Sequence, residues 1–302
     1  MANNQLQKST AAQFAAVLKA DSVQQQFRNA LGEHKDIFVS SLIDLYNGDK
    51  SLQACNTNAL VCEALRAATL GLPLNKALGF AYIVVYYNNV KDERGMWHKV
   101  PTPTFIPGYK GYIQLAMRTG QYKTINADLV YEGELRKVNK LTGEIVFDGE
   151  RKSDKIVGYF CYFELINGFS KTLYMSVEDM AAYAKRYSPS ISRDATVDSL
   201  VKLAQENKPS QKVGWMGNFN DMAIKTVVRR LLSKYGYLSV EMQGAIATDT
   251  EGAEYADRND AISDNANKAV IPENATYEEV DTATGEIKDA GTEDKKEEAP
   301  NY

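Results

Sequence analysis

Hydrophobic positions recur with two different periods along this chain, and the two periods occupy separate stretches. The helical period predicts helices over residues 35–46, 59–70, 109–119, 177–187 and 220–235. Alternating or short apolar runs between turn residues predict strands over residues 80–87, 102–106, 124–131, 134–139, 144–147, 156–165 and 170–175. The Asn167-Gly168 pair is typical of a hairpin turn. We therefore predict an α+β fold, with a helical N-terminal part and antiparallel strands and hairpins packed against helices.

The two ends of the chain lack the pattern of a folded core. Residues 1–21 are mostly Ala, Gln, Asn and Lys, which predicts a flexible N-terminus. From Thr248 onward there is no Phe, Trp, Leu or Met, so this stretch cannot bury a core of its own. We expect a folded core over residues 22–247 and a disordered acidic tail over residues 248–302.

The charge of the chain is divided along the same line. Residues 249–302 hold 16 acidic and 5 basic side chains, a net charge of −11, whereas residues 1–248 hold 30 basic and 23 acidic side chains, a net charge of +7. The overall charge of −4 therefore conceals a basic body. This asymmetry is typical of proteins that bind nucleic acid.

The basic character is strongest between Arg94 and Ala127, which contain five Lys or Arg and no Asp or Glu. Aromatic residues are interleaved with these cations, a composition that suits single-stranded nucleic acid, because its bases offer flat apolar faces to a cationic surface. The alternative is an ordinary strand, turn and helix, whose aromatic residues form core and whose lysines are solvated.

Two of the predicted helices have a cationic face. On the helix after Pro107-Gly108, the side chains of Lys110, Gln114 and Arg118 fall together, opposite an apolar arc. On the helix that we predict Asn220 to cap, one half is apolar and the other carries four cations and no acid, namely Lys225, Arg229, Arg230 and Lys234. A basic helix face that is merely solvated is the alternative. The polar stretch before this helix, residues 190–217, is interpreted as a loop.

Four blocks of sequence carry a resemblance to a known family. They are Leu72-Pro73-Leu74-Asn75, Gly108-Tyr109-Lys110-Gly111, Arg118-Thr119-Gly120-Gln121-Tyr122 and Val130-Tyr131-Glu132-Gly133-Glu134. In this order they resemble the signature region of the RecT family of phage-type single-strand annealing proteins, over roughly residues 30–240. Two departures stand out: Asn218 and Asn220 replace more acidic residues, and Gly236 stands where a proline is common.

The resemblance implies a cytoplasmic protein that coats single-stranded DNA as a homo-oligomer and promotes ATP-independent pairing through an annealed duplex intermediate. It also implies phage-type homologous recombination beside a phage exonuclease and a host single-strand binding protein. The acidic tail is the candidate contact for these partners, and the alternative is a solubilising tail that competes weakly for the basic groove. A passive single-stranded DNA coat protein without annealing activity is the alternative. The residues that we expect to bind DNA are cations, one amide and aromatic rings: Lys76, Lys110, Gln114, Arg118, Lys123, Tyr109, Tyr122, Lys185, Arg186, Lys212, Trp215, Lys225, Arg229 and Arg230.

The sequence gives little support to enzymatic chemistry, and we expect no catalytic residue, cofactor or metal. His34 and His98 are isolated, and the glycines of Gly108-Tyr109-Lys110-Gly111 are too close together for a nucleotide-binding P-loop. Two further alternatives remain: a purely structural oligomer, and a metal-dependent nuclease if Asp128, Glu132 and Glu134 converge. No apolar run reaches the roughly 18 residues of a membrane span, so we expect no membrane association.

Overall fold

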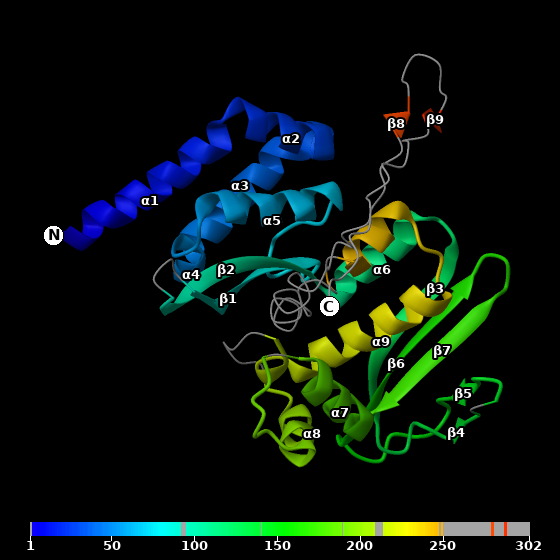
Figure 1. The fold of residues 1–302 in the computed structure, drawn as a ribbon. Helices are drawn as coiled ribbons and strands as arrows, with labels where there is room; N and C mark the ends of the chain where they lie inside the picture. Colours follow the sequence, from blue (N-terminus) through cyan, green and yellow to red (C-terminus); the bar gives the residue numbers. More distant parts are fainter. Residues whose placement is uncertain are drawn as a thin grey trace, which may run out of the picture. The chain divides into compact units, whose positions relative to one another are not determined.

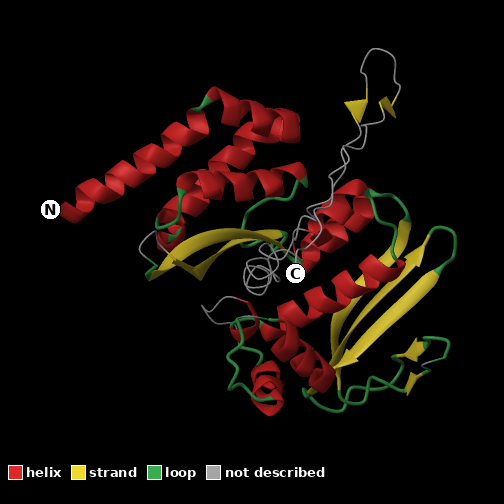
Figure 2. Ribbon diagram, in the orientation of Figure 1, coloured by secondary structure: helices red, strands yellow, loops and turns green. Residues whose placement is uncertain are grey.

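Each helix and strand expected from the sequence has a counterpart in the computed structural model of the chain (Figures 1 and 2). It describes residues 2–91, 95–139, 141–188, 190–208, 214–247, 249, 279–280 and 287–288. The chain divides into two units, residues 1–256 and 257–302. In the second, β8 (Glu279–Val280) pairs antiparallel with β9 (Ile287–Lys288). The predicted α+β class with antiparallel strands is confirmed, whereas the expected disorder of residues 248–302 falls mainly outside the described residues.

The N-terminal helices pack around one apolar cluster. They are α1 (Ala2–Lys19), α2 (Asp21–Leu31), the 3-10 turn η1 (Gly32–His34), α3 (Lys35–Gly48), α4 (Lys50–Gln53) and α5 (Thr57–Thr69). Phe14 and Leu18 of α1 are each 1% exposed, and the Phe14 ring stacks on Tyr46 with 4.1 Å between centroids. Phe14 and Leu18, one helical turn apart, therefore pack α1 into the core, and the flexibility expected of residues 1–21 stays a prediction.

A long hairpin follows, formed by β1 (Ala81–Lys91) and β2 (Trp97–Pro107), with register from Ala81 opposite Pro107 to Lys91 opposite Trp97. The outer edge of β2 lies along α5, where the Phe105 N–H donates to Glu63 Oε2 at 2.7 Å. The residues that share this outward direction, 101, 103 and 107, are prolines and carry no N–H. The β2 edge of the hairpin is therefore closed to further strand pairing.

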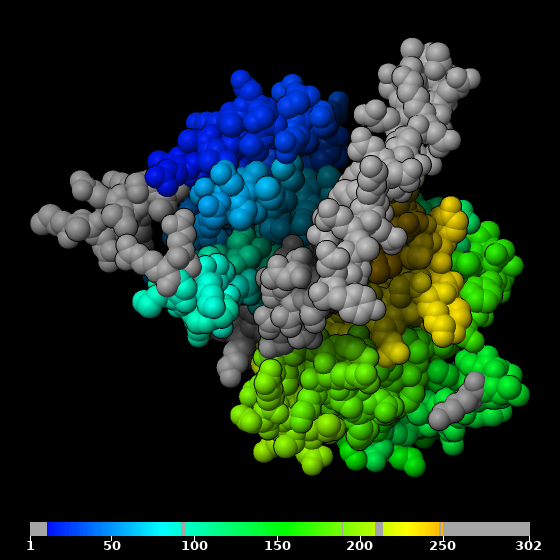
Figure 3. Space-filling model, viewed as in Figure 1, coloured from blue at the N-terminus to red at the C-terminus, as the bar shows by residue number. Residues whose placement is uncertain are grey.

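The main sheet is antiparallel, with strand order β3–β6–β7. Its strands are β3 (Tyr122–Tyr131), β6 (Ile156–Leu165) and β7 (Ser170–Ser176), and the small hairpin of β4 (Lys137–Val138) and β5 (Ile145–Val146) is inserted between β3 and β6. The helices α7 (Val177–Tyr187) and α9 (Phe219–Tyr235) pack on the sheet, and the surface of α9 (yellow) adjoins the green surface of the sheet layer in Figure 3. Residues 240–247 are also helical.

The helix α6 (Tyr109–Arg118) joins the hairpin to the sheet and contacts both α9 and β3. A Cβ atom at Gly108 would collide with the carbonyl oxygen of Gly79, and one at Gly111 with that of Phe80. The two glycines of Gly108-Tyr109-Lys110-Gly111 therefore let the first turn of α6 approach the backbone at the start of β1.

Two expectations about the C-terminal part of the core are wrong. The stretch 190–217 is not only loop, because it contains α8 (Val197–Glu206), whose first turn is closed by reciprocal hydrogen bonds between Thr196 and Ser199, and η2 (Gly214–Met216). Asn220 does not cap α9. It is buried within the first turn, where its side chain donates to Ala204 O and accepts from the Tyr159 hydroxyl at 2.6 Å.

Candidate nucleic-acid interface

The cationic face predicted for α6 is present, but its members have different surroundings. Lys110 is exposed, and its Nζ lies 6.0 Å from the centre of the Tyr109 ring; Gln114 is half-buried. Arg118 donates from Nη1 to Leu70 O and from Nη2 to Gly71 O, both at 2.8 Å. It thereby satisfies carbonyl groups at the C-terminal end of α5, a structural role that helical spacing did not indicate.

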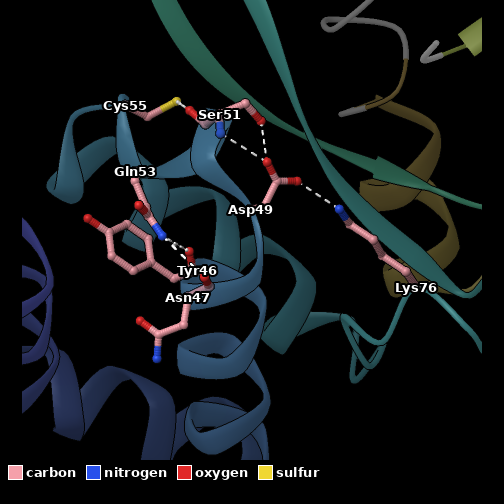
Figure 4. Close-up of polar contacts among 7 residues, drawn as sticks. All are labelled: Tyr46, Asn47, Asp49, Ser51, Gln53, Cys55 and Lys76. Atoms are coloured by element: carbon pink, nitrogen blue, oxygen red, sulfur yellow. Dashed lines mark hydrogen bonds and ion pairs between the residues drawn. The ribbon is translucent and has the colours of Figure 1, made fainter. Parts of the chain in front are cut away.

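Lys76 and Lys123 are exposed, and each is paired with a carboxylate. Figure 4 shows Lys76 Nζ pointing toward Asp49, with 2.7 Å to Oδ2, while the other carboxylate oxygen of Asp49 accepts from Ser51 at the start of α4. Lys123 Nζ lies 2.7 Å from Glu164 Oε1 on the neighbouring strand, and this hydrogen bond raises the pKa of Lys123. Solvent screens such exposed pairs, which add little to stability, so a phosphate can compete for the lysine.

The predicted cationic half of α9 is only partly a surface. Lys225 is buried, and so is the neighbouring Thr226, because α6 covers this side of α9 while the sheet covers the other. Arg229 keeps a side-chain exposure of 24%. Arg230 is exposed, with its guanidinium 5.2 Å from the centre of the Tyr183 ring on α7. The expectation that Lys225 lies on an open basic face is therefore wrong.

The buried side of α9 holds a cluster centred on Asp249. Its carboxylate lies 2.5 Å from Lys225 Nζ and 3.5 Å from Arg229 Nε, and it accepts a hydrogen bond from the Tyr112 hydroxyl of α6 at 3.0 Å. Burial lowers the pKa of Lys225 although Asp249 opposes the shift, and burial together with Asp249 raises the pKa of Tyr112 well above its usual value. No sequence signal singled out Asp249, because it is one acid among many in the final stretch.

The aromatic candidates divide between surface and core. Tyr109 is half-buried, whereas Trp215 and Tyr122 are each 6% exposed, so of these three rings only that of Tyr109 is partly open to solvent, and stacking on bases stays a prediction. Trp215 packs edge-on against Phe219, and the Tyr122 hydroxyl accepts from Tyr237 N at 2.8 Å. Aromatic composition alone could not separate a stacking ring from a core ring.

The remaining candidates lie at the end of α7. Lys185 and Arg186 are both exposed in its last turn, and the Arg186 guanidinium lies 5.2 Å from the Tyr187 ring. Tyr183 on the same helix is the ring beside Arg230, and the Tyr183 and Tyr187 rings lie 4.6 Å apart between centroids, so each ring of one aromatic pair carries an arginine. Lys212 lies outside the described residues.

The structure explains why a glycine stands at position 236, one of the two departures from the family pattern. A Cβ atom at this position would lie 2.5 Å from the Tyr122 hydroxyl oxygen and 2.7 Å from Leu232 O. A proline, which carries a Cβ, would displace the hydrogen bond between Tyr122 and Tyr237. The glycine is therefore matched to the buried Tyr122 in this chain.

The three acidic residues considered for a nuclease site, Asp128, Glu132 and Glu134, each accept a hydrogen bond from a different partner. Asp128 Oδ1 accepts from Leu129 N, and Glu134 Oε2 accepts from Tyr131 N, both at 2.7 Å. Glu132 Oε2 accepts from the Ser153 hydroxyl at 2.8 Å. Within the described ranges, no group of three or more His, Cys, Asp or Glu side chains is placed to hold a metal ion. In the same part of the chain, no helix has both the length and the apolarity of a membrane span.

Comparison with known proteins identifies relatives for most of the chain. The sequence model of a family described as "RecT family" matches residues 36–266. A Bacillus subtilis (strain 168) protein named "Uncharacterized protein YqaK" is 40% identical over 242 residues, covering 80% of this chain and 73% of the relative. "Protein RecT" of Escherichia coli (strain K12) is 29% identical over 201 residues, covering 66% of this chain and 65% of the relative.

Proposed function

Because this chain belongs to the RecT family of recombination and annealing proteins, we propose that it binds single-stranded DNA as a homo-oligomer and promotes ATP-independent annealing of complementary strands. Family membership carries the proposal, since the match spans both the N-terminal helices from α3 onward and the sheet with α9. The setting that we propose is phage-type homologous recombination.

The charge and position of the exposed cations support the proposal. The body of the chain is basic, with a net charge of +7 over residues 1–248. Lys110 on α6, together with Arg186 on α7 and Arg230 on α9, presents positive charge beside an aromatic ring in each case. Cations beside flat rings suit a strand that offers both phosphates and unstacked bases.

Annealing without ATP is thermodynamically reasonable. Base pairing is downhill by about 1.4 kcal/mol per base-pair step, so the protein needs only to remove obstacles to the search for register. Cations reduce repulsion between the two phosphate backbones, and a row of subunits holds many bases in one arrangement. In this proposal the protein supplies a binding surface for the strands, and base pairing supplies the free energy.

A fluorescence annealing assay with two complementary labelled oligonucleotides tests the proposal. We expect acceleration without ATP, and binding of single-stranded DNA whose log affinity falls with log salt by about 0.7 per phosphate contact. Binding without acceleration would indicate a passive coat protein, and absence of both would indicate a structural oligomer. Degradation of the oligonucleotides only when magnesium is added would indicate a nuclease.

We further propose that the acidic stretch after residue 247 contacts partner proteins, a phage exonuclease and a host single-strand binding protein. The net charge of −11 over residues 249–302 supports a contact that is separate from the basic body. A pull-down with the full chain and with a chain ending at Ala256 tests this, and equal capture by both would contradict it.

A further inference from the structure

The carboxylate of Asp249 occupies a site that would suit another oxyanion. Its side chain is 9% exposed and is surrounded by an ammonium group, a guanidinium group and a phenolic hydroxyl, from Lys225, Arg229 and Tyr112. These donors come from two helices, α9 and α6, that contact each other. Ammonium, guanidinium and hydroxyl groups donate to phosphate oxygens as readily as to carboxylate oxygens.

The buried ammonium group of Lys225 favours an anion at this site. The side chain of Lys225 is 8% exposed, and burial lowers its pKa. Removing the anion from a buried ammonium group is strongly destabilising, because the charge loses its partner and stays out of water. Among the described residues, Asp249 supplies the negative charge beside Lys225 and Arg229.

The place of Asp249 in the sequence indicates how the anion could be exchanged. It is the first of the 16 acidic residues in the stretch 249–302 and follows the helical residues 240–247. Because the Asp249 carboxylate belongs to the same chain as the site, its effective concentration there is high, and it competes with any free anion. A ligand that binds more tightly still displaces it.

Resting on the proposed function, we infer that Lys225, Arg229 and Tyr112 form a binding site for a backbone phosphate of single-stranded DNA, which Asp249 fills until the DNA displaces it. Asp249 is then an internal competitor that weakens the binding of a single free anion. A polynucleotide that engages the other cations at the same time overcomes the competition. The alternative is that Asp249 is a permanent counter-ion of Lys225.

The first test compares Asp249→Asn with Asp198→Asn, which removes the same charge from an exposed position on α8. If the site is closed about nine-tenths of the time, loss of the competitor tightens the apparent affinity for oligothymidylate by about tenfold. We expect this gain for Asp249→Asn and no change for Asp198→Asn. Unchanged or weaker binding by a folded Asp249→Asn protein would overturn the inference.

A second measurement uses the unaltered chain, in case Asp249→Asn does not fold. Amide hydrogen exchange over residues 240–249 is followed with and without saturating oligothymidylate. Displacement predicts faster exchange of this segment when DNA is bound, whereas unchanged or slower exchange would overturn the inference. If the unaltered chain binds no single-stranded DNA at all, the proposed function itself fails, so the two failures are distinguishable.

Discussion

Arg118 and Leu70 lie 48 positions apart in the chain and are joined by a hydrogen bond of 2.8 Å from the guanidinium Nη1 to the carbonyl oxygen. A second bond of the same length reaches Gly71 O, which has a positive φ of 59° at the end of α5. Arg118, one of the residues of α6 that we expected to bind DNA, therefore also links α6 to the end of the N-terminal helix α5.

Substitution of Arg118 by Lys should reduce stability while keeping the charge. A lysine cannot donate in two directions from a planar group, so at least one carbonyl at the end of α5 loses its partner. We expect a loss of about 1–3 kcal/mol in the free energy of unfolding, measured by urea denaturation. Lys110→Arg on the same face is the matched control and should leave stability within about 0.5 kcal/mol. Equal stability of both variants would contradict the structural role of Arg118.

Substitution of Gly111 by Ala should also destabilise the chain, although alanine is the better helix former. The added Cβ would collide with the carbonyl oxygen of Phe80, whereas a Cβ at Gly48 meets nothing within 4 Å. Overpacking costs about 1–3 kcal/mol and outweighs the gain of about 1 kcal/mol in helix propensity. Gly48→Ala, at the end of α3, should instead raise stability by about 0.5 kcal/mol. Thermal unfolding of the two variants measures the contrast. A stabilised Gly111→Ala protein would show that α6 does not pack closely against the Phe80 carbonyl group.

Much of the fold could be predicted from local pattern. Asn167-Gly168 marks the turn between β6 and β7, and Ser176 caps α7 by accepting from Asp179 N at 3.0 Å. These features depend on residues close in sequence, for which turn and cap preferences are strong. The helix α8 was missed because the stretch around it is polar, and only Leu200 and Ala204 are buried on its inner face.

The candidate site was predicted less well, because a helical projection assumes one buried face and one solvent-exposed face. α9 has two buried faces, since α6 lies opposite the sheet, and Lys225 falls between them. Burial of a lysine depends on an anion that comes from another part of the chain, in this case Asp249. Contacts of this kind join positions whose pairing has no local pattern.

Stability should fall at alkaline pH because of the buried thiol of Cys161. Burial raises its pKa from the usual 9.0 to about 12 in the folded chain. Between these values the unfolded chain has lost the proton and the folded chain retains it, so the stability present below pH 9 is lost as pH rises toward 12. The slope approaches roughly 1.4 kcal/mol per pH unit for one such group.

Denaturation of Cys161→Ala at several pH values between about 8 and 10 checks this expectation. The variant should show a flatter decline than the unaltered chain, whatever its absolute stability. Cys62→Ala removes an exposed thiol and should leave the slope unchanged. The buried Tyr159, whose pKa is also raised by burial, contributes in the same direction only above about pH 10, the usual value for tyrosine.

Charge reversal at Lys110 should weaken binding of single-stranded DNA without affecting the fold. Lys110 is exposed on α6 and contacts no carboxylate in the described part of the chain, so Lys110→Glu removes one proposed phosphate ligand and adds a repulsive charge. We expect affinity for oligothymidylate to fall about tenfold at about 0.1 M salt, and the salt slope to fall by about 0.7. Circular dichroism should be unchanged.

The matched control is Lys202→Glu, on the exposed side of α8, which alters the net charge equally and should change affinity less than twofold, or about 0.4 kcal/mol. Equal losses for the two variants would mean that DNA senses only the net charge of the body, and that the α6 face is not a binding site.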